Sequence, residues 1–166
     1  MVEEVILVNE SDEAIGTMEK LEAHKKGILH RAFSVFIFNS KNDLLLQQRA
    51  YTKYHSAGLW TNTCCSHPRP GEANLVAAQR RLKEEMGMET ELVYKTNFIY
   101  KTKFDNDLTE HEFDHVFVGN SDKEPLINGE EVNSYRWLSL DQVKAEIKSK
   151  PEEYTSWFRI AMEKLF

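Results

Sequence analysis

The sequence from residue 72 to residue 88 reads Glu72-Ala-Asn-Leu-Val-Ala-Ala-Gln-Arg-Arg-Leu-Lys-Glu-Glu-Met-Gly-Met88. Apolar side chains recur in it at three- or four-residue intervals, at Leu75, Ala78, Leu82 and Met86. This spacing places them on one face of an α-helix. Gly87 follows directly and is suited to the left-handed backbone that ends many helices. The pattern predicts a helix over about residues 74–86 whose apolar face packs on other elements.

On both sides of this helix, short runs of β-branched and aromatic residues predict strands. They cover residues 5–8, 33–38, 44–48, 92–101, 112–118 and 132–138, and a further short strand follows a turn at Asp12, Glu13 and Gly16. Turn-forming residues fill positions 39–43, so we expect the strands on either side to pair as a hairpin.

Two more helices are expected near the end of the chain. Ser139 and Gln142 have the spacing of a capping box for a helix that ends near Ser149. Helical spacing of apolar residues then predicts a last amphipathic helix, at Phe158, Ala161, Met162 and Leu165. Strands, a central helix, more strands and final helices indicate the α+β class, a mixed β-sheet with flanking helices.

Composition limits the classes of protein that fit. The chain has 166 residues, of which 41% are hydrophobic and 29% charged, so we expect a single globular domain over residues 1–166. The net charge is −6 without a long basic block, which argues against a nucleic-acid partner. No apolar run approaches the roughly 18 residues of a membrane span, and the beginning lacks the basic and apolar regions of a secretory signal.

The two cysteines, Cys64 and Cys65, are neighbours in the sequence. Adjacent positions are poorly placed for a structural disulfide, so we expect free thiols in a reducing compartment. The sequence therefore predicts a cytoplasmic protein.

Three carboxylates accompany the central helix: Glu72 at its beginning, and Glu84 and Glu85 near its end. Together they could hold Mg²⁺, which prefers oxygen ligands and also binds phosphates. The alternative is a solvated helix with ion pairs between Glu84 and Arg80 or Arg81. The charges alone favour that alternative.

A second group of residues is rich in nitrogen. His24, His30 and His67, with Glu110 and Glu112, offer mixed ligands that suit Zn²⁺, Mn²⁺ or Fe²⁺. A single histidine is more often a surface or core residue than a ligand. The chain has six histidines, and the other three are His55, His111 and His115. The residues alone do not show which three of the six bind a metal ion.

Residues 66–88 resemble the Nudix box, because Glu72, Arg80, Leu82, Glu84, Glu85, Gly87 and Met88 all fall in its register. Two positions depart from the box: Ser66 stands where glycine is expected, and Arg81 where the first helical glutamate is expected. This replacement removes a carboxylate and adds a guanidinium that can bind phosphate. The resemblance thus implies a Nudix-like fold whose site holds a diphosphate rather than hydrolysing it.

Residues 60–68, Trp-Thr-Asn-Thr-Cys-Cys-Ser-His-Pro, resemble the signature of the type I isopentenyl-diphosphate isomerases, which have a modified Nudix box. The resemblance extends over nearly the whole chain. Further matching positions are residues 16–20, His24, His30, Arg49, Lys53, Arg81, Tyr100, Glu110, Glu112 and residues 154–157.

The resemblance implies an enzyme that interconverts isopentenyl diphosphate and dimethylallyl diphosphate in isoprenoid biosynthesis. The reaction adds a proton to one carbon and removes one from another, so it needs an acid and a base on different sides of a small pocket. Cys65 and Glu112 are the implied pair, with Tyr100 beside Glu112. Trp157 would offer its aromatic face to the developing carbocation.

The resemblance also implies the ligands of the cofactors and of the substrate. Mn²⁺ or Zn²⁺ would be bound by His24, His30, His67, Glu110 and Glu112. Mg²⁺ would accompany the diphosphate through Glu85. The diphosphate itself would be bound by Lys20, Arg49, Lys53 and Arg81.

Two alternatives belong to other functional classes. The first is a Nudix pyrophosphohydrolase, which Arg81 argues against and which leaves the histidines unexplained. The second is a non-catalytic metal- or nucleotide-binding module of the same fold, in which Cys65 and Glu112 would be dispensable. The sequence leaves open whether the protein is a monomer or a homodimer.

Overall fold

The computed structural model describes residues 2–166. Its strands are β1 Glu4–Val8, β2 Ala14–Glu19, β3 His30–Phe38, β4 Asp43–Arg49, β5 Trp60–Thr61, β6 Cys64–Ser66, β7 Val93–Lys103, β8 Thr109–Asn120 and β9 Val132–Ser139. The helices are α1 Lys20–Lys26, α2 Asn74–Met86, α3 Leu140–Ser149 and α4 Ser156–Leu165, with a short 3-10 turn at Pro151–Glu153. Strands and helices alternate irregularly along the chain, as expected for the α+β class.

Strand β3 is the centre of the mixed sheet. It pairs in parallel with β8, from His30 opposite Glu112 to Phe38 opposite Asn120, and antiparallel with β6. The β8 strand also pairs with β7, while β4 lies between β5 and β9. The long parallel ladder therefore joins segments that are about 80 residues apart in the sequence.

The predicted hairpin of β3 and β4 is correct only at its closed end. Phe38 pairs with Leu44, but beyond this pair the two strands separate. There β3 pairs with β6 and β8, while β4 pairs with β9 and β5. Local turn residues indicate where two strands meet but not how far they stay paired, because partners from distant segments compete for the same backbone groups.

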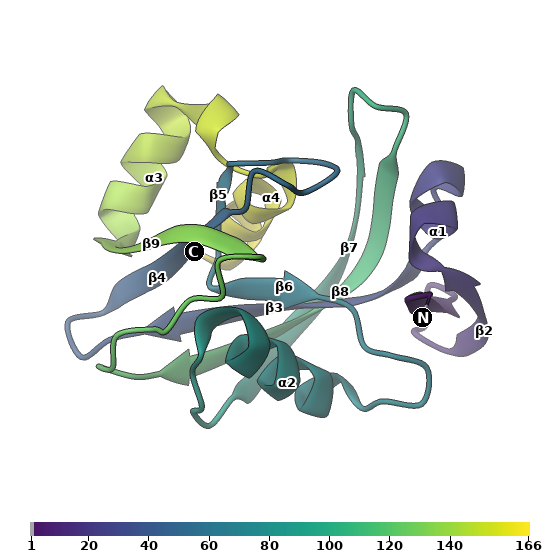
Figure 1. Cartoon of the computed structure of the whole chain (residues 1–166), viewed down its shortest axis with the longest axis horizontal. Coiled ribbons are helices and arrows are strands. Elements are labelled where there is room, and N and C mark those ends of the chain that lie inside the picture. Colours follow the sequence, from purple (N-terminus) through teal and green to yellow (C-terminus); the bar gives the residue numbers. More distant parts are fainter. Residues whose placement is uncertain (1) are drawn as a thin grey trace.

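Helices cover both faces of the sheet, with α2 on one side and α3 and α4 on the other (Figure 1). Side chains of β3 alternate between the two layers. Phe33, Val35 and Ile37 pack in the core that contains α2, whereas Phe36 packs in the core that contains α4. Burial on both faces explains why residues 35–38 of this strand are continuously apolar instead of alternating between polar and apolar residues.

The central helix has the bounds that its sequence predicts, Asn74–Met86. Gly87 ends it with φ +61°, and a Cβ at this position would lie 2.5 Å from the carbonyl oxygen of Leu126. One predicted core residue is wrong: Leu75 is 40% exposed, and Ala77 packs in its place. The helix is thus rotated so that its buried face contains Ala77 and Glu85 as well as Ala78, Leu82 and Met86.

Helix α1 was not predicted. It has only seven residues, most of them charged, so it lacks a visible apolar periodicity. Its ends are nevertheless specified locally. The Glu19 side chain accepts hydrogen bonds from the backbone of Leu21 and Glu22, and Gly27 ends the helix with φ +65°. At the other end of the chain, the capping box of Ser139 and Gln142 is confirmed, and α3 begins after it.

Among residues 2–166, no helix combines the length and the apolar character needed to cross a bilayer.

Candidate active site

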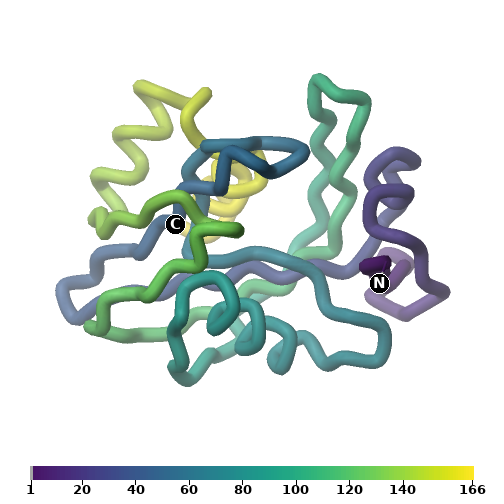
Figure 2. Tube along the Cα trace, viewed as in Figure 1, coloured from purple at the N-terminus to yellow at the C-terminus, as the bar shows by residue number. Residues whose placement is uncertain are grey.

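A cavity opens between the β4–β5 segment, the β7–β8 hairpin and α1, which rise on the same side of the sheet (Figure 2). Most residues that the sequence singled out line it. They are Lys20, Arg49, Lys53, Cys65, His67, Arg81, Glu85, Tyr100, Glu110, Glu112 and Trp157, and the other lining residues are Ser34, Gln47, Tyr54, His55 and Ser66. Two further candidates, His24 and His30, lie beneath this surface and are fully buried.

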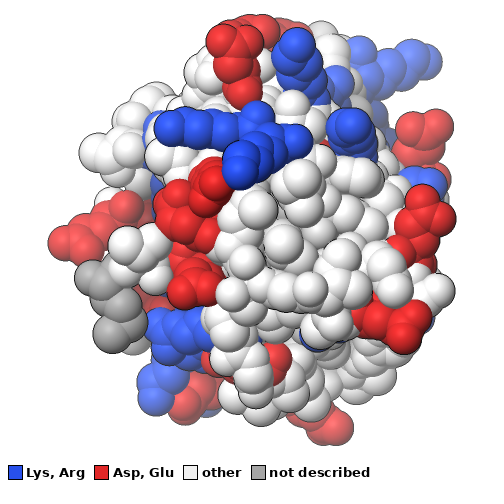
Figure 3. Space-filling view, turned by 90° about the vertical axis from the view of Figure 1, so that its right-hand side faces the viewer, with Lys and Arg blue, Asp and Glu red and all other residues white. Residues whose placement is uncertain are grey.

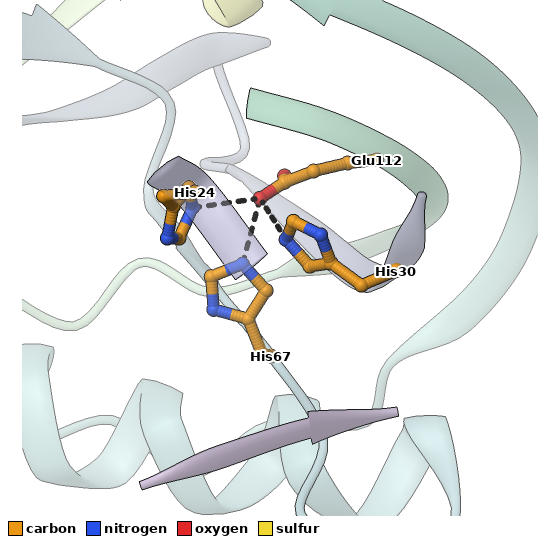
Figure 4. A group of neighbouring side chains, drawn as sticks. All are labelled: His24, His30, His67 and Glu112. Atoms are coloured by element: carbon orange, nitrogen blue, oxygen red, sulfur yellow. Dashed lines mark hydrogen bonds and ion pairs between the residues drawn. The ribbon is translucent and has the colours of Figure 1, made fainter. Parts of the chain in front are cut away.

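Three imidazoles converge on one carboxylate oxygen (Figure 4). The Oε2 atom of Glu112 lies 2.7 Å from Nε2 of His67, 3.0 Å from Nε2 of His30 and 3.8 Å from Nε2 of His24. We call these four residues the histidine cluster. His30 meets Glu112 because the two are direct partners in the parallel β3–β8 ladder, whereas His24 comes from α1 and His67 follows β6.

The hydrogen bonds of the histidine cluster fit a metal ion. Nδ1 of His24 lies 2.8 Å from the carbonyl oxygen of Lys20, and Nδ1 of His30 lies 2.8 Å from that of Ile28. A carbonyl oxygen only accepts hydrogen bonds, so each Nδ1 carries a proton and Nε2 is the nitrogen that each ring directs toward Glu112. Nε2 of His24 is buried without a hydrogen-bond partner. Nε2 atoms that surround one carboxylate oxygen are held there by shared protons or by a cation that binds both, and this donor set suits a divalent metal ion.

The surroundings of Glu110 and Glu112 shift their pKa values in opposite directions. Burial and the charge of Glu112 hold the pKa of Glu110 well above its usual range. Burial alone would also raise the pKa of Glu112, but the neighbouring His67, His24 and His30 bring it well below that range. The Tyr100 hydroxyl contacts both carboxyl groups. The hydroxyl has one proton, so it can donate to only one of the two carboxyl groups at a time.

The predicted set of five metal ligands separates into two overlapping groups. His24, His30, His67 and Glu112 form one, and His24, His55 and Glu110 form the other, each with ligand atoms within 4.8 Å of one another. Glu110 is therefore next to the histidine cluster but not within it. Its Oε2 atom lies 3.8 Å from Nε2 of His24.

The two cysteines have different surroundings because adjacent strand residues point to opposite faces of a sheet. Cys65 lines the cavity and pairs with Ser34 in the β3–β6 ladder. Burial raises the pKa of its thiol, which therefore stays protonated. Cys64 belongs to the core under α2, with Sγ 3.6 Å from Oε2 of Glu85. Both thiols are free, as expected.

Four cations surround the cavity, and we call them the basic rim: Lys20, Arg49, Lys53 and Arg81. Arg81 lies 2.8 Å from Glu85 and 3.4 Å from Glu131, which also pairs with Lys53. The guanidinium of Arg49 lies 5.2 Å from the centre of the Trp157 ring. On the face of the molecule that carries α1, basic and acidic side chains lie beside each other around a broad uncharged area (Figure 3).

The carboxylates of α2 do not gather around one point. Glu72 forms a two-bond ion pair with Arg80, and Glu84 pairs with Arg80 and Arg81 on the outer side of the helix. Only Glu85 lines the cavity, where its Oε1 accepts a hydrogen bond of 3.1 Å from the Gln47 amide. The ion-pair alternative thus describes Glu72 and Glu84, whereas Glu85 remains a candidate ligand.

The sequence does not distinguish His55 from the histidines that are not ligands. In the structure, however, its Nε2 lies 3.3 Å from Oε2 of Glu110, beside the histidine cluster. The sequence held no signal for this position, because the contact joins residues 55 apart and depends on the path of an irregular segment. The two remaining histidines lie elsewhere. His111 faces the carbonyl of Gly27, and His115 faces Asp12 on the opposite face of β8.

Comparisons with known proteins agree with this geometry. The model of the protein family described as "NUDIX domain" matches residues 28–158. The chain is 52% identical to the isopentenyl-diphosphate Delta-isomerase of Pectobacterium atrosepticum, over 98% of this chain and 90% of that protein. It is 54% identical to the isopentenyl-diphosphate Delta-isomerase 2 of Photorhabdus laumondii, over 96% and 90%. The relative from Serratia proteamaculans is 52% identical over 99% of this chain and 92% of its own.

Solved structures show the same fold at low sequence identity. DR0079 from Deinococcus radiodurans superposes with a TM-score of 0.83 at 20% identity, and the alignment covers 99% of both chains. The MutT protein from Methanosarcina mazei superposes with a TM-score of 0.66 at 20% identity, over 82% of this chain and 91% of that one.

Proposed function

The chain belongs to the NUDIX domain family and, within it, to the isopentenyl-diphosphate Delta-isomerases, and from this premise we propose how its cavity performs their reaction. The protein is an isomerase that interconverts isopentenyl diphosphate and dimethylallyl diphosphate in isoprenoid biosynthesis. One carbon of the alkene must gain a proton and another must lose one. The site must therefore hold an acid and a base and exclude water from the intermediate cation.

Cys65 and Glu112 exchange these protons. The observation that carries this assignment is that both side chains line one cavity, where the pKa of the Cys65 thiol is raised and the pKa of Glu112 is lowered. Tyr100 connects Glu112 to Glu110, so a proton has a hydrogen-bonded route to and from Glu112. The arrangement supplies an acid and a base without requiring a bound water.

NUDIX enzymes use divalent metal ions, and the histidine cluster supplies ligands for one. The residues that would hold Mn²⁺ or Zn²⁺ are His24, His30, His67, Glu110 and Glu112. When bound, the ion provides positive charge that fixes the carboxylates and alters their proton affinity. Glu85, oriented by Gln47 and Arg81, would hold Mg²⁺ with the diphosphate.

The basic rim binds the diphosphate, which anchors the substrate by contacts remote from the reacting carbons. Lys53 and Arg81 share Glu131 as a partner, so they are already held close together on one side of the cavity. Trp157 lines the same cavity as Cys65. Its aromatic face stabilises a cation by about 2 kcal/mol or more where water is excluded.

The test is proton NMR of isopentenyl diphosphate in D₂O with the protein, Mg²⁺ and either Mn²⁺ or Zn²⁺. Wild type is expected to form deuterated dimethylallyl diphosphate, and Cys65→Ala and Glu112→Gln are expected to lose this activity. Glu72→Gln is the matched control, because Glu72 is paired with Arg80 outside the cavity. Absence of isomerisation with every metal would refute the assignment, and release of phosphate or pyrophosphate would indicate a hydrolase instead.

A further inference from the structure

His55 has no part in the proton transfers or the diphosphate binding described above, yet it is only 8% exposed. It lies in the segment between β4 and β5, close to the metal-binding carboxyl groups. Its Nε2 is 3.3 Å from Oε2 of Glu110, and its Nδ1 is 3.3 Å from the Ser56 hydroxyl. If the hydroxyl donates to Nδ1, the neutral ring carries its proton on Nε2 and directs it toward Glu110.

Aromatic rings fix the orientation of this imidazole. It stacks on Phe104, with ring centres 4.6 Å apart and planes 9° apart. Trp157 and Tyr54 meet it edge to face, with centres 5.7 and 4.9 Å away. These residues come from the β7–β8 hairpin, from α4 and from the same segment as His55. Contacts on several sides leave the ring little freedom to turn its Nε2 away from Glu110.

Glu110 needs such a partner. Its Oε1 atom meets Tyr100, and its Oε2 atom lies between His55 and His24, at 3.3 and 3.8 Å. The backbone carbonyl of His55 accepts a hydrogen bond of 3.2 Å from Nη2 of Arg49, a member of the basic rim. The segment that carries His55 therefore contacts both a carboxyl group of the proposed metal site and the proposed diphosphate site.

We propose that His55 is a positioning residue of the metal centre, which holds Oε2 of Glu110 beside Nε2 of His24 through a hydrogen bond from its own Nε2. This inference rests on the proposed role of Glu110 as a metal ligand. Hydrogen bonds to ligating carboxylates set their orientation, and removal of such a partner typically lowers metal affinity 10- to 100-fold.

Direct ligation by His55 is the competing explanation, because His24, His55 and Glu110 themselves form a possible ligand group. His24 has a single free lone pair on Nε2 and can bind one ion. The group that contains His30, His67 and Glu112 offers four donors to that ion instead of three. An ion in the larger group leaves His55 as a hydrogen-bond donor to Glu110.

The test compares His55→Phe with His55→Gln. Phenylalanine keeps a planar ring for the stack on Phe104 but cannot donate to Glu110, whereas glutamine restores an N–H donor. His115→Phe is the matched control, because His115 also stacks on a phenylalanine, Phe113, and also faces a carboxylate, Asp12 at 3.0 Å, but on the opposite face of β8. Zn²⁺ affinity is measured by competition with a chromophoric chelator, without substrate, and Co²⁺-loaded protein is examined by visible absorption.

His55→Phe is expected to bind Zn²⁺ 10- to 100-fold more weakly, with Co²⁺ bands at the wild-type positions. His55→Gln should recover most of the affinity, and His115→Phe should match wild type. Unchanged affinity in His55→Phe would overturn the proposal, and so would shifted Co²⁺ bands, which would show that an imidazole ligand had been lost. If His55→Phe folds poorly, as judged by thermal unfolding without metal, His55→Leu against His55→Gln makes the same comparison. Because no turnover is measured, these outcomes are independent of the isomerase assay.

Discussion

The sequence predicts metal ligands both in the histidine cluster and among the carboxylates at α2, but only the histidine cluster brings its predicted ligands together at one point. In the histidine cluster, imidazole nitrogens and a carboxylate face one another in a buried space, and Nε2 of His24 has no hydrogen-bond partner. Glu72, just before α2, and Glu84, on α2, are each paired with arginine and do not line the cavity. Here the ligand-type residues that indicate a metal site are those that the fold gathers at one buried point, unlike Glu72 and Glu84.

Arg81 is the residue that separates the two regions. It occupies the position where the Nudix box has a glutamate, and it pairs with both Glu84 and Glu85. A guanidinium at this position lowers the net negative charge beside the cavity, and both Arg81 and Glu85 line the cavity. The α2 region is thereby suited to binding a diphosphate. The residues that could bind a metal ion without the substrate are gathered in the histidine cluster.

The largest expected effect is that of Glu112→Gln in the histidine cluster. The variant should lower kcat for isomerisation about 10³-fold, because it removes a group that both exchanges a proton and contacts three imidazoles. Glu84→Gln on α2 should stay within about twofold of wild type. Both rates are measured by NMR in D₂O. Equal losses of kcat in the two variants would contradict the different roles assigned to the histidine cluster and to α2.

Removal of metal should affect stability through the histidine cluster alone. An ion present at about 100 times its Kd stabilises the fold by about 2.7 kcal/mol, which corresponds to roughly 5–10 °C in Tm for a chain of this size. We expect a chelator to lower Tm by this amount and Zn²⁺ or Mn²⁺ to restore it. The shift should vanish in His30→Ala and persist in Glu84→Gln. Calorimetry provides the measurement, and a full shift in His30→Ala would place the ion elsewhere.

Arg81→Gln should separate substrate binding from chemistry. A hydrogen bond to a charged group contributes about 1.5–3 kcal/mol, so KM should rise about ten- to hundredfold while kcat changes less. Steady-state kinetics with isopentenyl diphosphate give both constants. A collapse of kcat with unchanged KM would instead assign Arg81 to the proton transfers.

Glu72→Gln should change only stability, and slightly. The ion pair with Arg80 lies near the surface, where such pairs contribute about 0.5–1 kcal/mol to the free energy of unfolding. Urea denaturation measures this difference, and the isomerase rate should be unchanged. A loss of isomerase activity greater than twofold would indicate that Glu72 contributes to the active site, for example as a metal ligand.

The smallest effect concerns the pH dependence of stability at His115. Burial lowers the pKa of this imidazole, although Asp12 acts in the opposite direction and Arg31 in the same one. Its ordinary pKa is about 6.5, so its stabilising contribution is complete above that pH and declines as the pH falls through the lower value of the folded state. His115→Phe should therefore lose less stability than wild type between pH 6.5 and 5. Zn²⁺ should not alter this difference, because His115 and Asp12 alone form no metal site.

Local patterns predicted much of the fold. The bounds of α2, the capping box of α3 and the positions of the main strands follow from residues close together in the sequence. The outward position of Leu75, the separation of β3 from β4 and the path of the segment with His55 depend on packing between distant elements. Helix α1 was missed because its signals are caps and not apolar periodicity.

The candidate residues were recognised by their spacing within motifs, while their relations could be known only from the structure. The sequence named His30 and Glu112, but only the parallel ladder places them opposite each other. Spacing also did not indicate that Tyr100 would contact both glutamates or that Glu110 would lie outside the histidine cluster.

The ladder between β3 and β8 has a consequence for the order of events during biosynthesis. A ribosome that has completed residue 111 has delivered every imidazole of the histidine cluster but not its carboxylate, and β8 continues to Asn120. At a synthesis rate of roughly 5–20 residues per second, the partially made chain contains these histidines for several seconds before Glu112 is added. A cation in the finished arrangement can therefore be acquired only late in translation or after it, once the strand that closes the site has emerged.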